Sequence, residues 1–244
     1  MSDYWAGKAV GVSGVVTPVR LALEAALAEA GVHLTSLSPD ATAGLLHQTL
    51  ARLSALDGWV HFPELMSWPL LAADGAFSHR VGRCLQEAHQ TLSAVGQKMR
   101  SQQRGAVVVM TDLGGLSVRH GDVAGATASA ALLQLSRALG VTWAKDGVRV
   151  NAVAMGHLDG ATSGGEREID QARTPLGRLA KDSEVAKAAL FLLSDDASFI
   201  TAECLPVDGG WLAYQYFYPA AHPAGGVPKG PTAGENGSGG VVDG

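Results

Sequence analysis

The sequence predicts an α/β fold, a doubly wound parallel sheet with helices on both faces. Two observations support this prediction. Short apolar runs such as 105–111 (GAVVVMT) lack polar alternation, which is typical of strands buried on both sides of a parallel sheet. Longer segments with apolar residues at helical spacing, such as 122–139, separate these runs. Strands that alternate with helices in this way favour parallel pairing.

The elements follow from apolar periodicity and from the turn residues that bound each segment. Only one helix fits between the second and third strands. The predicted strands are 8–13, 32–37, 56–62, 105–111, 148–153 and 204–207. The predicted helices are 21–30, 41–53, 77–100, 122–139 and 183–193.

Length and composition bound the function classes. The 244 residues fit one domain at 1–211, followed by an extension at 212–244 that is first aromatic and then rich in Gly and Pro. A net charge of -5 argues against nucleic-acid binding, and no apolar run approaches the roughly 20 residues of a membrane span. The first nine residues lack a signal-peptide pattern, and Cys84 and Cys204 make no disulfide framework. We expect a soluble, cytoplasmic protein without a metal site.

The stretch from Pro175 to Gly210 carries several motifs in register. PLGR stands at 175–178, EVA at 184–186, FLLSDDASFIT at 191–201 and VDGG at 207–210. The earlier segment 146–154 (DGVRVNAVA) fits the same pattern. Together these motifs resemble the short-chain dehydrogenase/reductase family. The resemblance implies a Rossmann-like fold and subunit contacts through 183–211.

The loop after the first strand departs from the family's phosphate-binding pattern, TGxxxGxG. Gly14 stands at the first glycine, whereas Pro18 and Arg20 replace the second and third. In the family these glycines let the backbone approach the pyrophosphate, so the resemblance implies that this chain has lost its cofactor site. We expect Pro18 to begin the helix, since proline is favoured in the first turn. The alternative is that Arg20 holds a phosphate, such as one of coenzyme A.

The resemblance also implies that part of the sheet is missing. The family normally has two helices and another strand where this chain has only the helix 41–53, and a strand–helix step needs roughly 30 residues. The sheet is therefore expected to be one strand short at this edge, with the unit after the second strand shortened and the adenosine half of the cofactor site absent. The family's NNAG motif corresponds to 61–64 (HFPE). There, His61 and Glu64 suggest an acid/base pair, and the plainer interpretation is that they are surface or loop residues.

The family's catalytic positions carry other residues here. Alignment on 130–139 and 146–154 places the family's serine at Asp112, its tyrosine at Gly125 and its lysine at Ser129. In the family the lysine lowers the pKa of the tyrosine, which passes a proton while the cofactor passes a hydride. Gly125 has no side chain and Ser129 no cation. The resemblance therefore implies that catalysis is lost.

Two function classes remain open. The first is a non-catalytic subunit, a pseudoenzyme, that completes a hetero-oligomer. It would contact a related active subunit through 183–211 and the aromatic segment 214–218, and only that partner would bind NAD. The second is a repurposed enzyme, a lyase, dehydratase or cyclase, that uses Asp112 and His120. The plainer interpretation of these two residues is that Asp112 caps a turn and His120 is a solvated loop residue.

Overall fold

A computed structural model of the chain describes residues 2–67, 77–118, 122–160 and 165–214. Contacts between residues divide the chain into one unit of Met1–Tyr214 and another of Gln215–Gly244. The second unit, which holds most of the expected extension, lies outside the described residues. The domain boundary expected after residue 211 stays a prediction.

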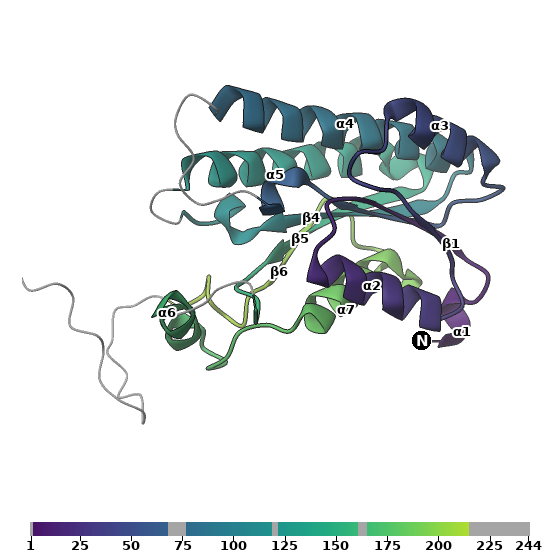
Figure 1. Cartoon of the computed structure of the whole chain (residues 1–244). Coiled ribbons are helices and arrows are strands. Elements are labelled where there is room, and N and C mark those ends of the chain that lie inside the picture. Colours follow the sequence, from purple (N-terminus) through teal and green to yellow (C-terminus); the bar gives the residue numbers. More distant parts are fainter. Residues whose placement is uncertain (1, 68–76, 119–121, 161–164, 215–244) are drawn as a thin grey trace, which may run out of the picture. The chain divides into compact units, whose positions relative to one another are not determined.

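The first unit is built on a six-stranded parallel sheet in the order β2-β1-β3-β4-β5-β6 (Figure 1). Every strand lies within two residues of its predicted bounds, so the predicted fold class is confirmed. The strands are β1 (Ala9–Gly14), β2 (His33–Ser36), β3 (Gly58–Phe62), β4 (Gly105–Asp112), β5 (Val148–Met155) and β6 (Cys204–Val207).

Helices cover both faces of this sheet. Figure 1 shows α2 and α7 on one face and α3, α4 and α5 on the other. The α-helices are α1 (Ser2–Trp5), α2 (Pro18–Glu29), α3 (Ala43–Arg52), α4 (Phe77–Ser101), α5 (Val123–Trp143), α6 (Gly165–Arg173) and α7 (Asp182–Leu193). Short 3₁₀ turns are η1 (Glu64–Ser67), η3 (Leu113–Gly115), η4 (Ala144–Asp146) and η5 (Asp195–Ala197).

The core forms two layers, one on each side of the sheet. Side chains alternate along a strand, so Val10 and Val12 of β1 pack with the residues of α2 and α7. Trp59 of β3 packs in the opposite layer with residues of α3 and α4. Gly11 makes room for this indole, because a Cβ at Gly11 would lie 2.0 Å from the Trp59 ring.

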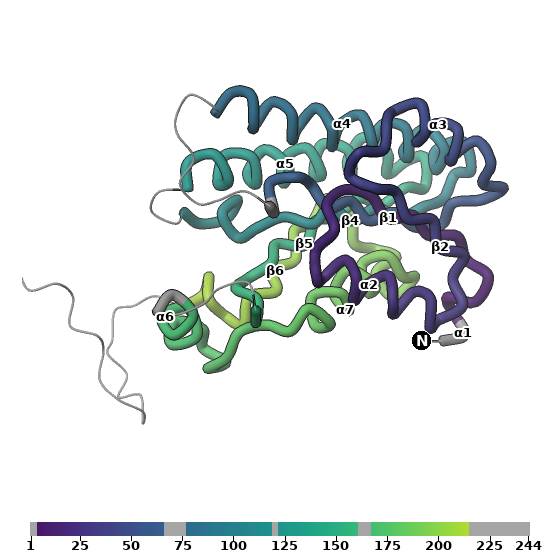
Figure 2. The backbone as a smooth tube through the Cα atoms, viewed as in Figure 1, coloured from purple at the N-terminus to yellow at the C-terminus, as the bar shows by residue number. Residues whose placement is uncertain are grey.

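The sheet ends at β2, as expected (Figure 2). In the described sheet β1 pairs with β2 on one side and with β3 on the other. Only α3 lies between β2 and β3 along the chain. The predicted shortened unit after the second strand is therefore confirmed.

The described helices extend the predicted set. α2 begins at Pro18, as expected, three residues before the apolar segment 21–30, because the Thr17 hydroxyl caps its first turn. α1 was not predicted, and α5 ends at Trp143, four residues beyond the predicted end. α6 was not predicted, since Ile169 and Ala172 are its only aliphatic residues and give no periodic signal. No helix in the described parts of the chain is both long and apolar enough to cross a membrane.

Candidate functional site

The carboxyl ends of parallel strands form the edge at which α/β folds bind ligands. In this chain the edge gathers Gly14 from β1, His61 and Phe62 from β3, and Asp112 from β4. The loop after β1, the segment around His61 and Asp112 therefore lie at one edge of the sheet. The contacts of these residues determine whether this edge can bind a ligand.

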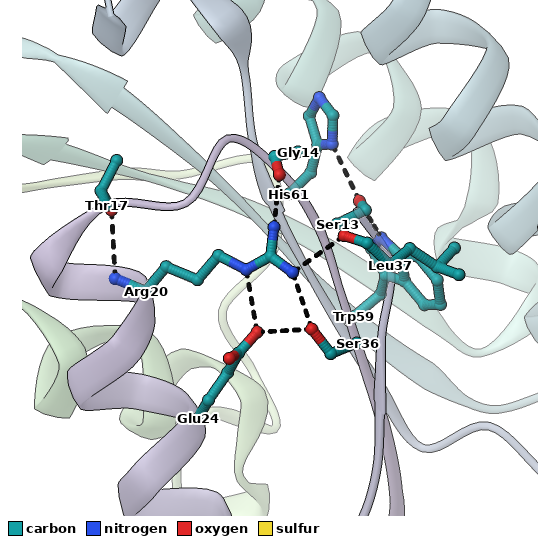
Figure 3. A network of polar contacts seen from close by, with 9 residues as sticks. All are labelled: Ser13, Gly14, Thr17, Arg20, Glu24, Ser36, Leu37, Trp59 and His61. Carbon is teal, nitrogen blue, oxygen red and sulfur yellow. Dashed lines mark hydrogen bonds and ion pairs between the residues drawn. The ribbon is translucent and has the colours of Figure 1, made fainter. Parts of the chain in front are cut away.

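Arg20 is the central residue of this edge. Its side chain is 2% exposed and points back under the loop after β1 (Figure 3). Nε donates to Glu24 Oε1 at 2.8 Å, while Nη2 donates to Ser36 Oγ at 2.7 Å and to the Leu37 carbonyl at 2.8 Å. Nη1 donates to the Gly14 carbonyl. The guanidinium thus has four partners within its own chain.

These bonds bear on both expectations for the loop. The Thr17 hydroxyl accepts from the Arg20 amide at 3.1 Å and Pro18 occupies the first turn of α2, so the prediction that Pro18 begins the helix is confirmed. The same helix start turns the Arg20 side chain toward β2. The guanidinium of Arg20 is already bonded to four groups of this chain. The geometry therefore does not support the alternative that Arg20 binds a phosphate.

Gly14 is held by backbone packing. It has a φ of 93°, a conformation that side chains disfavour, and a Cβ at this position would lie 1.8 Å from the Phe62 carbonyl oxygen. That same oxygen accepts from the Val15 amide at 2.8 Å. The first glycine of the loop is therefore required by the contact between the ends of β1 and β3, whether or not a pyrophosphate binds.

His61 is fully buried, so the expectation of a surface or loop residue was wrong. It lies within β3, and its Nδ1 is 3.0 Å from Ser13 Oγ on the neighbouring strand. Trp59 Nε1 donates to the same hydroxyl at 2.9 Å, so Ser13 Oγ joins the indole and the imidazole. His61 Nε2 has no hydrogen-bond partner among the described residues. Burial, followed by the positive charge of Arg20, lowers the pKa of His61 to about 4 from 6.5.

His61 should make the protein less stable in mild acid. The unfolded chain takes up a proton on this ring below pH 6.5, whereas the folded chain keeps it neutral down to about pH 4. The stability linked to a neutral His61 is complete above pH 6.5 and falls by about 2–3 kcal/mol as the pH drops to 4.5. Urea unfolding at pH 7.5 and 4.5 should show this loss in the wild type and a smaller one in His61→Gln. Equal losses in both proteins would contradict the assignment.

Glu64 does not pair with His61. Its carboxylate is bound by Arg83 of α4 at 2.6 Å, so the suggested acid/base pair is not formed. Beside Ser13 and Gly14 the described residues enclose a cavity of about 50 Å³, far smaller than the roughly 300–1,000 Å³ of ligand pockets. Glu87 lines this cavity, and burial raises its pKa to about 7. Such a volume suits a solvent molecule.

Asp112 caps the turn η3. Its Oδ1 accepts from the Gly114 amide at 2.6 Å, so the interpretation of Asp112 as a turn cap is confirmed. The proposed partner, His120, lies outside the described residues. The structure therefore places Asp112 in a structural role and leaves its pairing with His120 as a prediction.

Gly125 and Ser129 lie one helical turn apart near the start of α5, and both are buried. Asp122 caps this helix, its Oδ1 accepting from the Gly125 amide at 3.0 Å. A Cβ at Gly125 would lie 2.4 Å from that oxygen, so the capping carboxylate occupies the space of a side chain. Ser129 Oγ has no hydrogen-bond partner among the described residues.

The turn η3 covers this part of α5. A Cβ at Gly115 would lie 2.9 Å from the Ser129 carbonyl carbon, and one at Gly114 would lie 3.3 Å from the Ala126 Cα. The loop backbone therefore packs directly on the helix. Cys84 of α4 is also buried, which raises its pKa to about 11. Neither arrangement supplies an exposed proton donor or a cation.

Comparison with known proteins decides the family. A protein-family model described as "Enoyl-(Acyl carrier protein) reductase" matches residues 22–212. A cis-4-hydroxycyclohexanecarboxylate dehydrogenase from Sinomonas cyclohexanicum is 34% identical over 188 residues, covering 71% of this chain and 73% of that protein. The chain belongs to the short-chain dehydrogenase/reductase family. A probable 2,4-dienoyl-CoA reductase from Bacillus subtilis is 42% identical over 120 residues, 46% of this chain and 47% of the relative.

Solved structures of other proteins share the fold. A gluconate 5-dehydrogenase from Burkholderia cenocepacia, in complex with NADP and tartrate, superposes with a TM-score of 0.75. It is 20% identical and the match covers 88% of this chain and 99% of that one. A chain described as ribose-5-phosphate isomerase from Brucella melitensis gives a TM-score of 0.75 at 21% identity, over 87% and 95% of the two chains. At these identities the likeness concerns the fold.

A larger hollow lies at the opposite edge of the sheet in this family member. It measures about 580 Å³, and its lining includes the amino ends of β4 and β5. Four of its charged groups form two ion pairs, Arg104 with Asp57 at 3.4 Å and Lys8 with Asp195 at 3.9 Å. Arg149, which also lines the hollow, donates to the backbone carbonyls of Leu192, Leu193 and Ser194. In the described part of the chain, no cluster of three or more His, Cys, Asp or Glu residues suits a metal ion.

Sequence reasoning missed the acceptors of Arg20. The spacing of Arg20 and Glu24 signals a helical ion pair, but such pairs usually lie in solvent. Ser36 and Leu37 become partners only because β2 lies beside β1 in the sheet. A buried arginine that bridges two strand ends has no local sequence signal.

Proposed function

We propose that this short-chain dehydrogenase/reductase is a non-catalytic subunit that assembles with, and supports, an active NAD-dependent dehydrogenase subunit. One observation carries the proposal. The side chain of Arg20 replaces a glycine of the phosphate-binding loop, and its guanidinium bonds Gly14, Glu24, Ser36 and Leu37. In the family this region binds a dinucleotide. In this chain the guanidinium of Arg20 occupies the region and is bonded to groups of the same chain.

The expected catalytic positions support the same proposal. Gly125 has no group that can pass a proton, and Ser129 has no charge that would lower the pKa of a phenol. The site for the adenosine half of a cofactor would also be incomplete, because this chain lacks the strand that follows β2 in active members of the family. Under this proposal NAD is bound by the partner, and the chain itself carries no cofactor.

The partner is proposed from two observations. The 183–211 region exposes Phe191 by 38% and Phe199 by 104%, and large exposed apolar side chains favour protein contacts. The pattern of losses resembles the inactive subunit of the 2-(hydroxybenzyl)succinyl-CoA dehydrogenase of anaerobic toluene degradation. One relative is named for an acyl-CoA substrate. We therefore propose a cytoplasmic heterotetramer acting on a 3-hydroxyacyl-CoA, with contacts through 183–211 and the aromatic segment after Trp211.

Native mass spectrometry of the protein purified from its own cells tests this proposal. The expected result is a complex with a second subunit of similar mass, with cofactor lost from that subunit alone. Phe199→Glu and a chain lacking 212–244 should both weaken the complex, whereas Leu45→Glu, an exposed leucine on α3, should not. A homo-oligomer without a second subunit, or nucleotide carried by this chain, would overturn the proposal.

A further inference from the structure

The loss of a strand–helix unit leaves β2 as an edge strand. β2 pairs with β1 in parallel, from Ala9 with His33 to Val12 with Ser36, and no described segment lies on its other side (Figure 2). An edge strand presents a row of backbone donors and acceptors that can pair with another strand. β2 therefore has one side available for an intermolecular contact.

The hydrogen bonds of β2 define which groups face outward. The His33 amide donates to the Lys8 carbonyl and the Leu37 amide to the Val12 carbonyl, each at 2.8 Å. Backbone groups along a strand alternate between its two sides. The N–H and C=O groups of Leu34 and Ser36 consequently point away from β1.

The segment lacks the features that usually protect an edge. Residues 32–38 (VHLTSLS) contain no lysine, arginine, aspartate, glutamate or proline. Proteins commonly place such residues on edge strands to prevent pairing. Arg20 also holds β2 in place through Ser36 Oγ and the Leu37 carbonyl, so little conformational entropy would be lost on pairing.

The neighbouring helix offers an apolar stripe. Leu21, Ala25 and Ala28 of α2 are exposed at helical spacing, Leu21 by 56%. Glu24 of α2 accepts a hydrogen bond from Ser36 of β2. Around the helix axis, Ala28 lies about 40° and Leu21 about 60° from Glu24, so the stripe begins next to the side of α2 that contacts β2. Small side chains at this position allow two helices to approach each other closely.

We propose that β2 pairs with β2 of a second copy of this chain, antiparallel about a two-fold axis at Thr35. In this register Leu34 faces Ser36 of the partner subunit and Ser36 faces Leu34 of the partner subunit. All four outward N–H groups then find carbonyl acceptors, because hydrogen-bonded pairs exchange both bonds. The two sheets become continuous and the two α2 stripes lie side by side. In a two-fold dimer the same surface of both subunits must fit itself, and the outward groups of β2 meet this requirement.

The proposed contact does not depend on the proposed function. It uses the β2 edge, whereas the expected hetero-oligomer contacts lie in 183–211. If both hold, two copies of this chain form the centre of a heterotetramer. If the active partner does not exist, the β2 dimer still stands.

Cysteine cross-linking of the isolated full chain tests the register. On the axis the two Thr35 residues form a non-hydrogen-bonded pair, with Cα atoms about 4.5 Å apart, which a disulfide can bridge. The two His33 residues would lie four steps apart along the strands, about 13 Å, which no disulfide spans. In a Cys204→Ser background, Thr35→Cys should give a covalent dimer on mild oxidation and His33→Cys should not. No cross-link at 35, or equal cross-linking at 33, would overturn the register.

A second variant tests the dimer without oxidation. Thr35→Lys places two like charges on the axis and adds the charge that protects natural edges. Light scattering should give a dimer for the wild type and a monomer for Thr35→Lys, with unchanged circular dichroism. The control Leu45→Lys, on the exposed side of α3, should remain dimeric. A monomeric wild type, or an unchanged mass for Thr35→Lys, would overturn the proposal.

Discussion

Replacing Arg20 with alanine is expected to lower the free energy of unfolding by about 3–5 kcal/mol. The substitution removes a side chain that is 2% exposed and leaves the Glu24 carboxylate without its cation. It also leaves the carbonyls of Gly14 and Leu37 without this donor. Unsatisfied buried groups cost their full desolvation, so the loss is a large part of an ordinary domain's stability. Urea unfolding measured by circular dichroism gives the value.

Arg178 provides the matched control. It also pairs with a glutamate, Glu184, here through two hydrogen bonds, but this pair is exposed to solvent. Arg178→Ala should therefore change stability far less than Arg20→Ala. Similar losses in the two variants would mean that the Arg20 cluster contributes no more than a surface ion pair.

Replacing Gly14 with alanine is the second change with a large expected effect. The φ of 93° is unfavourable for alanine, and the new Cβ would collide with the Phe62 carbonyl oxygen. Backbone strain and overpacking together should cost about 2–5 kcal/mol. The measurement is the free energy of unfolding of the variant, compared with the wild type in the same buffer without nucleotide.

Gly82→Ala is the control for this prediction. Gly82 lies within α4 and is exposed, and a Cβ added there would meet no other atom within 4 Å among the described residues. Alanine there should raise stability by about 0.5–1 kcal/mol, because glycine weakens helices. If Gly14→Ala is as harmless as Gly82→Ala, the loop is not held by its contact with Phe62.

The fold could be predicted from the sequence because its signals are local and repeated. The continuous apolar run of β4 and the motif-rich stretch from α7 to β6 fix the strand and helix types and their order. The loss of the strand–helix unit after β2 could also be predicted, since the segment 41–53 is too short to hold more than α3. α6 was missed because a polar helix leaves no apolar period in the sequence.

The site was less predictable because its contacts join distant segments. Pro18 was correctly expected to start a helix, a property of the residue itself. His61 was wrongly placed on a surface or in a loop, although the predicted strand 56–62 includes it, because a strand prediction does not say which side chains the neighbouring elements will bury. His61 is buried because β3 pairs with β1 on one side and with β4 on the other, and this strand order cannot be derived from the spacing of residues in the sequence.

Titration of the isolated chain with NAD and NADP, oxidised and reduced, tests the central claim most directly. The Arg20 cluster and the lost strand–helix unit predict no binding of any of the four nucleotides by isothermal calorimetry at millimolar concentrations. An active short-chain dehydrogenase/reductase measured in the same way gives the reference isotherm. Arg20→Gly should not restore binding, since the adenosine half of the site would still be absent. A micromolar isotherm for any of the four with the wild-type chain would contradict the account.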